Sequence, residues 1–128
     1  MKITVVGGNS GTGAQVIQIA RDAGHQLTCL SRSGMPTPIQ GVLDVAGDAL
    51  DGEVVRTAVE DADVVIVTVG GSSGTNRHRT AVTQSVISAM QDVGVRRLIV
   101  HSSLGVGDSM TLMPAPARLF TRTVLKSA

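Results

Sequence analysis

Residues 5–13 read VVGGNSGTG, and this glycine-rich run follows directly on the short apolar stretch of residues 3–6. Apolar residues then recur with helical spacing over residues 16–23. A glycine-rich turn between a buried strand and a helix suits a phosphate group, because glycines allow a sharp turn and the helix N-terminus attracts anions. Gly7 is predicted to make the turn and Gly13 to let the helix pack closely. The amides from Ser10 to Gly13 are predicted to face a pyrophosphate.

The rest of the chain continues this alternation of strand and helix. Apolar, β-branched runs predict strands at residues 3–6, 27–30, 41–45, 64–69 and 97–100, and apolar stripes predict helices over residues 16–23, 50–58 and 82–93. Gly24 and Gly94 stand where the first and last of these helices are expected to end. About ten residues with Gly34, Pro36 and Pro38 separate the second and third strands, which favours a loop there. The pattern predicts an α/β fold with a doubly wound parallel sheet, as one domain over residues 1–128.

Five strands are visible, whereas doubly wound nucleotide-binding sheets usually have about six or more. Residues 105–116 are expected to form a loop, and residues 118–128 have helical character with no glycine or proline after them. The expectation is therefore a domain that is incomplete at its C-terminus. An uncovered edge on the fifth strand would then lead to self-association.

Composition excludes several classes of partner. The net charge is +1 and Phe120 is the only aromatic residue, so neither a broad basic field nor a stacking surface is available for nucleic acid. The apolar runs are far shorter than the ~20 residues of a membrane span. Cys29 is the only cysteine, which excludes intrachain disulfides and fits a cytoplasmic protein. His25, His78 and His101 do not cluster in the predicted fold, so no metal site is expected.

The residues after the glycine run separate the classes of phosphate-binding protein. Gly8 and Gly13 have Walker A spacing, but Ala14 and Gln15 follow where a lysine and a hydroxyl are needed, so a nucleoside triphosphatase is excluded. The spacing of Gly7, Gly11 and Gly13 is G-x-x-x-G-x-G, and it resembles that of the short-chain dehydrogenase/reductase superfamily. The closest likeness is to its atypical branch, the NmrA-like and biliverdin reductase B (flavin reductase) proteins. Their G-A-T-G-x-x-G motif falls on Gly7, Gly8, Asn9, Ser10 and Gly13, with Ser10 in place of the middle glycine and Gly11 and Thr12 between.

This resemblance covers nearly the whole chain and implies a Rossmann fold that binds NAD(P). It implies that Asp48, with Ala49 beside it, meets the adenine amino group. It also implies that the backbone of Val69, Gly70 and Gly71 passes the nicotinamide-side ribose. Ser102 and Ser103 then stand where the family has its active-site serine, and His101 adjoins them.

The end of the second strand indicates which dinucleotide binds. NAD-specific proteins carry an acidic residue there for the ribose 2′-hydroxyl, and no carboxylate occurs between Asp22 and Asp44. The sequence has Ser31, Arg32 and Ser33 instead, a guanidinium and two hydroxyls suited to a 2′-phosphate. NADP(H) is therefore predicted over NAD.

Two functions remain open from the sequence. The first is an NADP-dependent oxidoreductase that passes a hydride to a small quinone, flavin, tetrapyrrole or carbonyl acceptor. The chain has no tyrosine, so the usual Tyr-x-x-x-Lys relay is excluded and Ser103 becomes the candidate proton donor, unless it only caps its strand. The second is a non-catalytic, NADP-binding redox sensor of the NmrA-like kind. Arg77, His78 and Arg79 are interpreted first as a solvated helix start, with contact to a phosphate or substrate carboxylate as the alternative.

Overall fold

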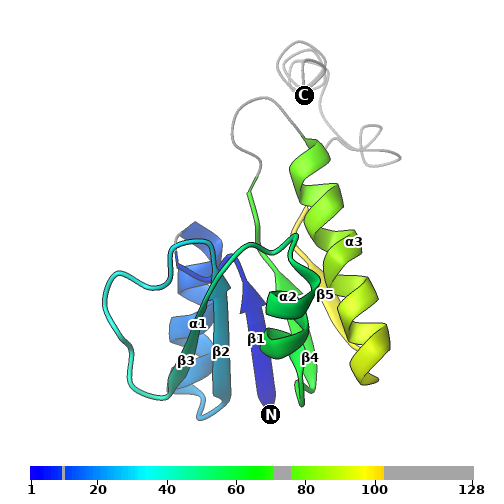
Figure 1. The fold of residues 1–128 in the computed structure, drawn as a ribbon. Coiled ribbons are helices and arrows are strands. Elements are labelled where there is room, and N and C mark those ends of the chain that lie inside the picture. Colours follow the sequence, from blue (N-terminus) through cyan, green and yellow to red (C-terminus); the bar gives the residue numbers. More distant parts are fainter. Residues whose placement is uncertain (10, 71–75, 103–128) are drawn as a thin grey trace, which may run out of the picture.

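The computed structural model describes residues 1–9, 11–70 and 76–102, which form a five-stranded sheet with helices on both faces (Figure 1). The strands are β1 (Lys2–Val6), β2 (Gln26–Ser31), β3 (Val42–Ala46), β4 (Val64–Val67) and β5 (Leu98–Val100). The helices are α1 (Gly11–Asp22), α2 (Gly52–Val59) and α3 (Asn76–Val93). The predicted alternation is confirmed, and the segment between β2 and β3 contains no helix, as expected. The loop and helix expected beyond residue 102 lie outside the described residues.

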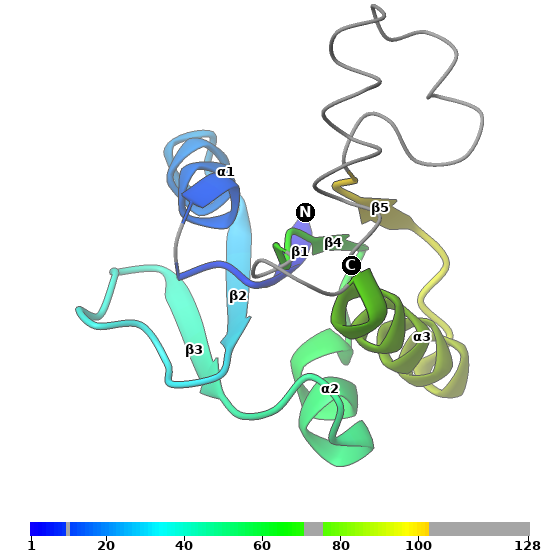
Figure 2. The ribbon, with the colours of Figure 1, turned by 90° about the horizontal axis from the view of Figure 1, so that it is seen from above.

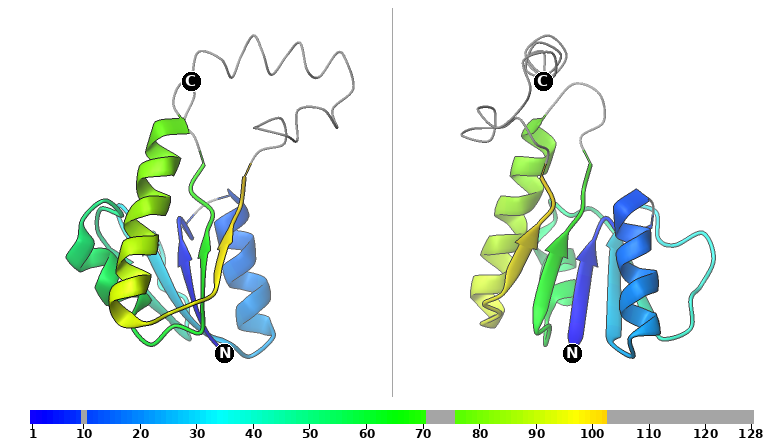
Figure 3. Two further views of the ribbon diagram at one scale, coloured as in Figure 1. Left: turned by 90° about the vertical axis from the view of Figure 1, so that its right-hand side faces the viewer. Right: turned by 180° about the vertical axis from the view of Figure 1, so that it is seen from behind.

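The strands follow the order β3-β2-β1-β4-β5, and every neighbouring pair is parallel. Figure 3 shows the strands side by side with their carboxyl ends along one edge. From β3 at one edge the chain passes through α2 and enters β4 on the far side of β1. The order of the strands thus reverses between β1 and β4, and in such sheets ligands bind outside the carboxyl ends at that point.

β4 ends at Val67, two residues before the predicted end at Val69. The apolar run continues to Val69, but β1 ends at Val6, which is the register partner of Val67. Beyond that pair β1 turns away at Gly7, whose φ is +91°. Without a neighbour to continue the ladder, Thr68 and Val69 leave the sheet at its carboxyl edge.

Alternate residues of β1 face two separate cores. Ile3 and Val5 pack with Ile17 of α1 on one face. Val6 packs on the other face with residues of α2 and α3, among them Val55 and Val86. Figure 2 shows α1 on one side of the sheet and α2 and α3 on the opposite side. This arrangement is the doubly wound architecture that the sequence predicted.

Local signals end the helices as expected. Gly24 and Gly94 have φ values of +84° and +79°, the left-handed conformation that favours glycine after a helix. At the other end of a helix, Asp51 caps the N-terminus of α2, because its side chain accepts a hydrogen bond from the backbone N–H of Glu53.

The described residues contain no helix long and apolar enough to cross a membrane.

On β5, Ile99 and Val100 are 46% and 37% exposed. Self-association through this edge stays a prediction.

Candidate functional site

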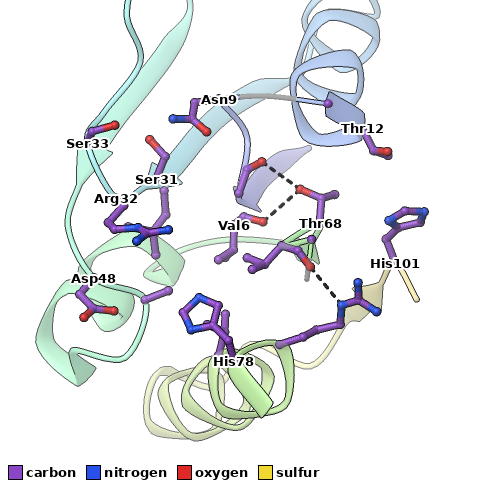
Figure 4. Close-up of a pocket in the computed structure, with 18 of the residues that line it drawn as sticks. Val6, Asn9, Thr12, Ser31, Arg32, Ser33, Asp48, Thr68, His78 and His101 are labelled. Carbon is purple, nitrogen blue, oxygen red and sulfur yellow. Dashed lines mark hydrogen bonds between the residues drawn. The ribbon is translucent and has the colours of Figure 1, made fainter. Parts of the chain in front are cut away.

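The described residues line an open cavity of about 770 Å³ at the carboxyl edge of the sheet. Ligand pockets commonly measure about 300–1,000 Å³. The cavity brings together most of the residues proposed from the sequence: Gly7, Asn9, Gly11, Thr12, Ser31, Arg32, Ser33, Asp48, Ala49, Val69, Gly70 and His101. Figure 4 shows Arg32, Ser33 and Asp48 on one side of it and Thr12 and His101 on the other.

The glycine run forms the turn that its sequence predicts. Gly7 takes a φ of +91°, and its N–H donates to Leu30 O at 2.8 Å, which ties the turn to β2. α1 then begins at Gly11, whose φ is +53°. The first N–H groups of a helix have no partner within it, so those of Gly11 and Thr12 stand at the cavity as donors for an anion.

Gly8 and Gly13 do not line the cavity; they make the turn compact. A Cβ on Gly13 would overlap Gly7 O and come within 2.5 Å of Thr68 Oγ1. A Cβ on Gly8 would overlap Ile17 and come within 2.7 Å of Cys29 Sγ. The close packing of α1 predicted for Gly13 is confirmed. Both glycines affect the cavity indirectly, because the close packing that they allow fixes the position of the turn.

Thr68 connects this turn to β4, and nothing in the sequence signalled it, because a threonine in an apolar run reads as an ordinary strand residue. Its hydroxyl lies 3.1 Å from Val6 O and 3.2 Å from Gly7 O (Figure 4). Its backbone N–H also donates to Val6 O, at 2.9 Å. Thr68 is 8% exposed. The hydroxyl therefore holds the end of β1 and the glycine turn against the end of β4.

We expect Thr68→Val to lower the free energy of unfolding by about 1–3 kcal/mol, because the carbonyl groups of Val6 and Gly7 would lose the hydroxyl donor. The turn would also lose its fixed position, so affinity for a ligand phosphate should fall. Thr68→Ser keeps the hydroxyl and is the matched control. Urea unfolding and calorimetric titration of the two variants provide the test. A loss in the serine variant, with the valine variant unchanged, would show that the methyl group, and not the hydroxyl, matters.

The end of β2 presents three polar residues in different settings. Ser31 is 6% exposed, and its Oγ has no nitrogen or oxygen partner among the described residues. Cys29, a weak hydrogen-bonding group, lies on the same face of the strand. Arg32 and Ser33 are exposed, and Arg32 makes no ion pair with a described residue. A buried hydroxyl without a strong partner beside an unpaired guanidinium suits a polar, anionic ligand.

Two contacts hold the segment after Arg32 in place. Gly34 has a φ of +78°, and its carbonyl accepts from Asn9 Nδ2 at 3.4 Å. Asp44 Oδ2 accepts from the N–H of Met35 at 2.9 Å. Asn9 thus links the glycine turn to the β2 end, and Asp44 fixes the segment to β3. The sequence reasoning proposed Asn9 for the site but did not detect Asp44.

Asp48 has a local role beside the one proposed for it. Its Oδ1 accepts from the N–H of Leu50 at 2.8 Å, and its carbonyl accepts from Asp51 N at 2.9 Å. These bonds shape the turn that leads from β3 into α2. Asp48 is exposed at the cavity, so its second carboxylate oxygen, Oδ2, is the one left for a ligand.

The far side of the cavity is built from the ends of β4 and β5 and the start of α3. Arg79 Nε donates to Val69 O at 3.1 Å, and the Arg79 side chain is half-buried. The interpretation of Arg79 as part of a solvated helix start is therefore wrong, because its side chain turns onto the cavity wall. The N–H of His101 donates to Val67 O at 2.9 Å, which carries His101 to the same edge.

The remaining candidates divide into three groups. Ser10, Gly71 and Ser103 lie outside the described residues, and so does the proton-donor role proposed for Ser103. Ser102 is exposed and does not line the cavity. His78 lines it from α3.

No metal centre forms in the part of the chain that the structure describes, where no three His, Cys, Asp or Glu residues gather. Cys29 is fully buried, and this burial, with the charge of Asp44 as a second cause, raises the pKa of its thiol. The thiol stays neutral and packs as a small apolar side chain.

The sequence profile of a family described as NAD(P)H-binding matches residues 7–127. The chain belongs to this NAD(P)H-binding family. This match predicts the glycine turn, the strand order and the cavity at the carboxyl edge. It confirms the resemblance to NAD(P)-binding proteins that the sequence indicated.

Known relatives of this NAD(P)H-binding protein include oxidoreductases. The 3-beta-hydroxysteroid dehydrogenase of Mycolicibacterium neoaurum is 29% identical over 119 residues, which is 82% of this chain and 32% of that protein. Isoflavone reductase homolog P3 of Arabidopsis thaliana is 28% identical over 128 residues, 91% of this chain and 39% of that protein. The chain thus spans about a third of the length of these curated relatives.

A solved structure of an anaerobillin reductase from Escherichia coli O157:H7 has the same fold. It superimposes with a TM-score of 0.75 at 24% identity, over 99% of this chain and 63% of that one. The fold and the family agree on an NAD(P)H-binding domain.

A nicotinamide dinucleotide fits the described residues. The start of α1, beside the turn at Gly7, offers N–H donors for a pyrophosphate, and Ser31 offers a buried hydroxyl without a strong partner. Arg32 and Asp48 line the cavity after β2 and β3, and Val69 and Gly70 line it after β4.

Proposed function

We propose that this protein is an NADP(H)-dependent oxidoreductase of the atypical short-chain type, which reduces a small quinone, flavin, tetrapyrrole or carbonyl compound. The observation that carries the choice of NADP(H) is the end of β2, where exposed Arg32 has no ion-pair partner among the described residues. A guanidinium binds a phosphate in bidentate fashion, and the flanking hydroxyls of Ser31 and Ser33 complete a phosphate-binding group.

The chain's own residues bind and orient the cofactor in this proposal. The turn at Gly7 and the first amides of α1 hold the pyrophosphate, and Arg32 holds the 2′-phosphate. Asp48 and Ala49 border the adenine, and Val69 and Gly70 border the second ribose. The nicotinamide supplies a hydride when bound, and Ser103 is the proposed proton donor.

This proposal predicts that NADPH binds at least tenfold more tightly than NADH. Hydrogen bonds to a charged group contribute about 1.5–3 kcal/mol, which corresponds to roughly 10 to 150-fold in affinity. Calorimetric titration with the two cofactors, at one salt concentration, measures the ratio. Equal dissociation constants would remove the role given to Arg32.

A redox sensor is the second candidate, and the absence of tyrosine from all 128 residues favours it. Such a protein would bind NADPH without oxidising it. NADPH oxidation is therefore followed by absorbance over a panel of quinones, flavins, tetrapyrroles and carbonyl compounds. Turnover with one acceptor class supports the enzyme, and tight NADPH binding without turnover on the whole panel supports the sensor. A single buried thiol suits the reducing cytoplasm that we propose as its location.

A further inference from the structure

His101 lies at the end of the cavity that β4 and β5 border. Val67 and Val100 are the last register pair of these two strands, and the N–H of His101 donates to Val67 O at 2.9 Å. This places His101 level with Thr68, one residue before Val69. In the proposed function, Val69 borders the second ribose, so His101 stands at the end where an acceptor meets the cofactor.

The imidazole of His101 is open to the cavity. The residue is exposed, and no described residue forms a hydrogen bond or an ion pair with its ring. The main-chain bond to Val67 O, and not a side-chain contact, holds the residue at this edge. Figure 4 shows its ring on the side of the cavity opposite Asp48. The ring nitrogens are therefore able to exchange a proton with a ligand.

The other charged and titratable groups of the cavity come from three elements. Arg32 and Asp48 line it after β2 and β3, and His78 and Arg79 line it from α3. An arginine is always protonated, and histidine is the side chain that ordinarily changes its charge near neutral pH. Of the two histidines, His101 is the one beside the end of β4. It is the best placed group to give up a proton there.

The walls of the cavity favour a small acceptor. No Phe, Tyr or Trp is among the described residues that line it, so they offer no ring on which a flavin or a tetrapyrrole would stack. The lining near β4 consists of Thr68, Val69 and Gly70, with Val82 from α3. Among small acceptors, a carbonyl compound needs an acid most, because hydride transfer to it leaves a strongly basic oxygen. A reduced quinone is a much weaker base.

We propose that the acceptor is a small carbonyl compound and that the imidazolium of His101 is the acid from which its proton comes. This rests on the proposed function and narrows its substrate class. The carbonyl carbon takes up the hydride that the cofactor supplies, and the electron pair of the C=O double bond moves to the oxygen. The ring of His101 loses its proton and the acceptor oxygen gains one. The neutral ring then takes a proton from water, to which it is exposed.

This assignment also gives Ser103 of the proposed function a source for its proton. A serine hydroxyl does not titrate near neutral pH, so it donates a proton only when it receives another. His101 stands two positions before Ser103 in the sequence. With His101 as the acid, the hydroxyl of Ser103 is a relay for the same proton.

The test follows NADPH oxidation with benzaldehyde and with menadione, a quinone, at saturating NADPH from about pH 6 to 9. The ratio of the benzaldehyde rate to the menadione rate is compared, because changes in cofactor binding or stability affect both rates and cancel. In the wild type this ratio should fall as the pH rises through the neutral range in which histidines titrate. The sign follows because the protonated ring is the acid.

His101→Gln should lower the ratio by roughly 100 to 10,000-fold at the acidic end and remove its pH dependence, since a general acid contributes about that much. The backbone N–H of residue 101 is kept, so the fold should persist. His25→Gln, outside the cavity, is the matched control and should keep both the ratio and its pH dependence. His78→Gln should keep the pH dependence. A loss of this dependence in His78→Gln, and not in His101→Gln, would overturn the assignment.

A second readout does not require turnover. The chain has three histidines, so their ring signals in NMR spectra are assigned from the three glutamine variants. Benzaldehyde added to the NADP⁺-saturated protein meets no hydride and stays unreduced. It should shift the ring signals of His101 and leave those of His25 in place. Unchanged His101 signals up to the solubility limit of benzaldehyde would overturn the proposal.

The remaining outcomes separate this inference from the proposed function. Reduction of menadione but not of benzaldehyde would overturn the role of His101 and leave the oxidoreductase function standing. Reduction of benzaldehyde with an unchanged pH dependence in His101→Gln would do the same. No turnover by the wild type on the whole acceptor panel would overturn the oxidoreductase function, and the role of His101 with it.

Discussion

Gly13→Ala is expected to reduce NADPH affinity by roughly 10 to 100-fold, the effect of losing hydrogen bonds to a charged phosphate. The added Cβ would overlap Gly7 O and lie within 2.9 Å of Gly7 C and 2.5 Å of Thr68 Oγ1. Gly7 is part of the turn itself and Thr68 is hydrogen-bonded to it, so no flexible side-chain end can move aside. α1 must shift away from the turn, and its first amides shift with it.

The same clash should lower the free energy of unfolding by about 1–3 kcal/mol, the usual cost of overpacking. Calorimetric titration measures the affinity, and circular dichroism with urea unfolding checks that the sheet persists. Gly52→Ala is the control, because a Cβ there would meet no atom within 4 Å. It should leave NADPH binding unchanged. An unchanged affinity in Gly13→Ala would mean that the turn tolerates displacement and that its exact position does not determine binding.

Arg32→Glu is expected to reverse the cofactor preference. A carboxylate at the end of β2 repels the 2′-phosphate and accepts hydrogen bonds from the ribose hydroxyls of NADH. The NADPH dissociation constant should rise by roughly 10 to 150-fold, while that for NADH stays the same or falls. Arg32 is exposed and has no ion-pair partner among the described residues, so stability should change by less than about 0.5 kcal/mol.

Arg21→Glu is the matched control for this charge reversal. Arg21 forms a surface ion pair with Asp22 in the last turn of α1, and it does not line the cavity. Both cofactors should bind this variant as they bind the wild type. Equal losses of NADPH and NADH affinity in Arg32→Glu would indicate a general disturbance of the site in place of contact with the 2′-phosphate.

Much of the fold follows from the sequence because its signals are local. Short β-branched runs alternate with helical apolar stripes, and Gly7, Gly24 and Gly94 stand where the backbone takes a positive φ. These features depend on neighbours within a few residues, so they predict the strands, the helices and the glycine turn. The predicted position of Arg32 at the cavity follows in the same way, since it comes directly after a strand of a parallel sheet, whereas the position of Asp48, two residues after β3, was implied by the family resemblance.

The tertiary structure alone decided which distant residues meet. β4 stops at Val67 because β1 turns away at Gly7, and no pattern within residues 64–69 contains that information. Thr68 reaches the glycine turn across 61 positions of the sequence, and Arg79 folds back onto Val69 instead of facing solvent. Such contacts arise from pairing and packing between elements, in which a side chain's partner is set by the sheet order and not by its neighbours in the chain. The sequence therefore predicted the glycine turn, whereas the hydrogen bonds of Thr68 to this turn and of Arg79 to Val69 depend on how the strands are arranged.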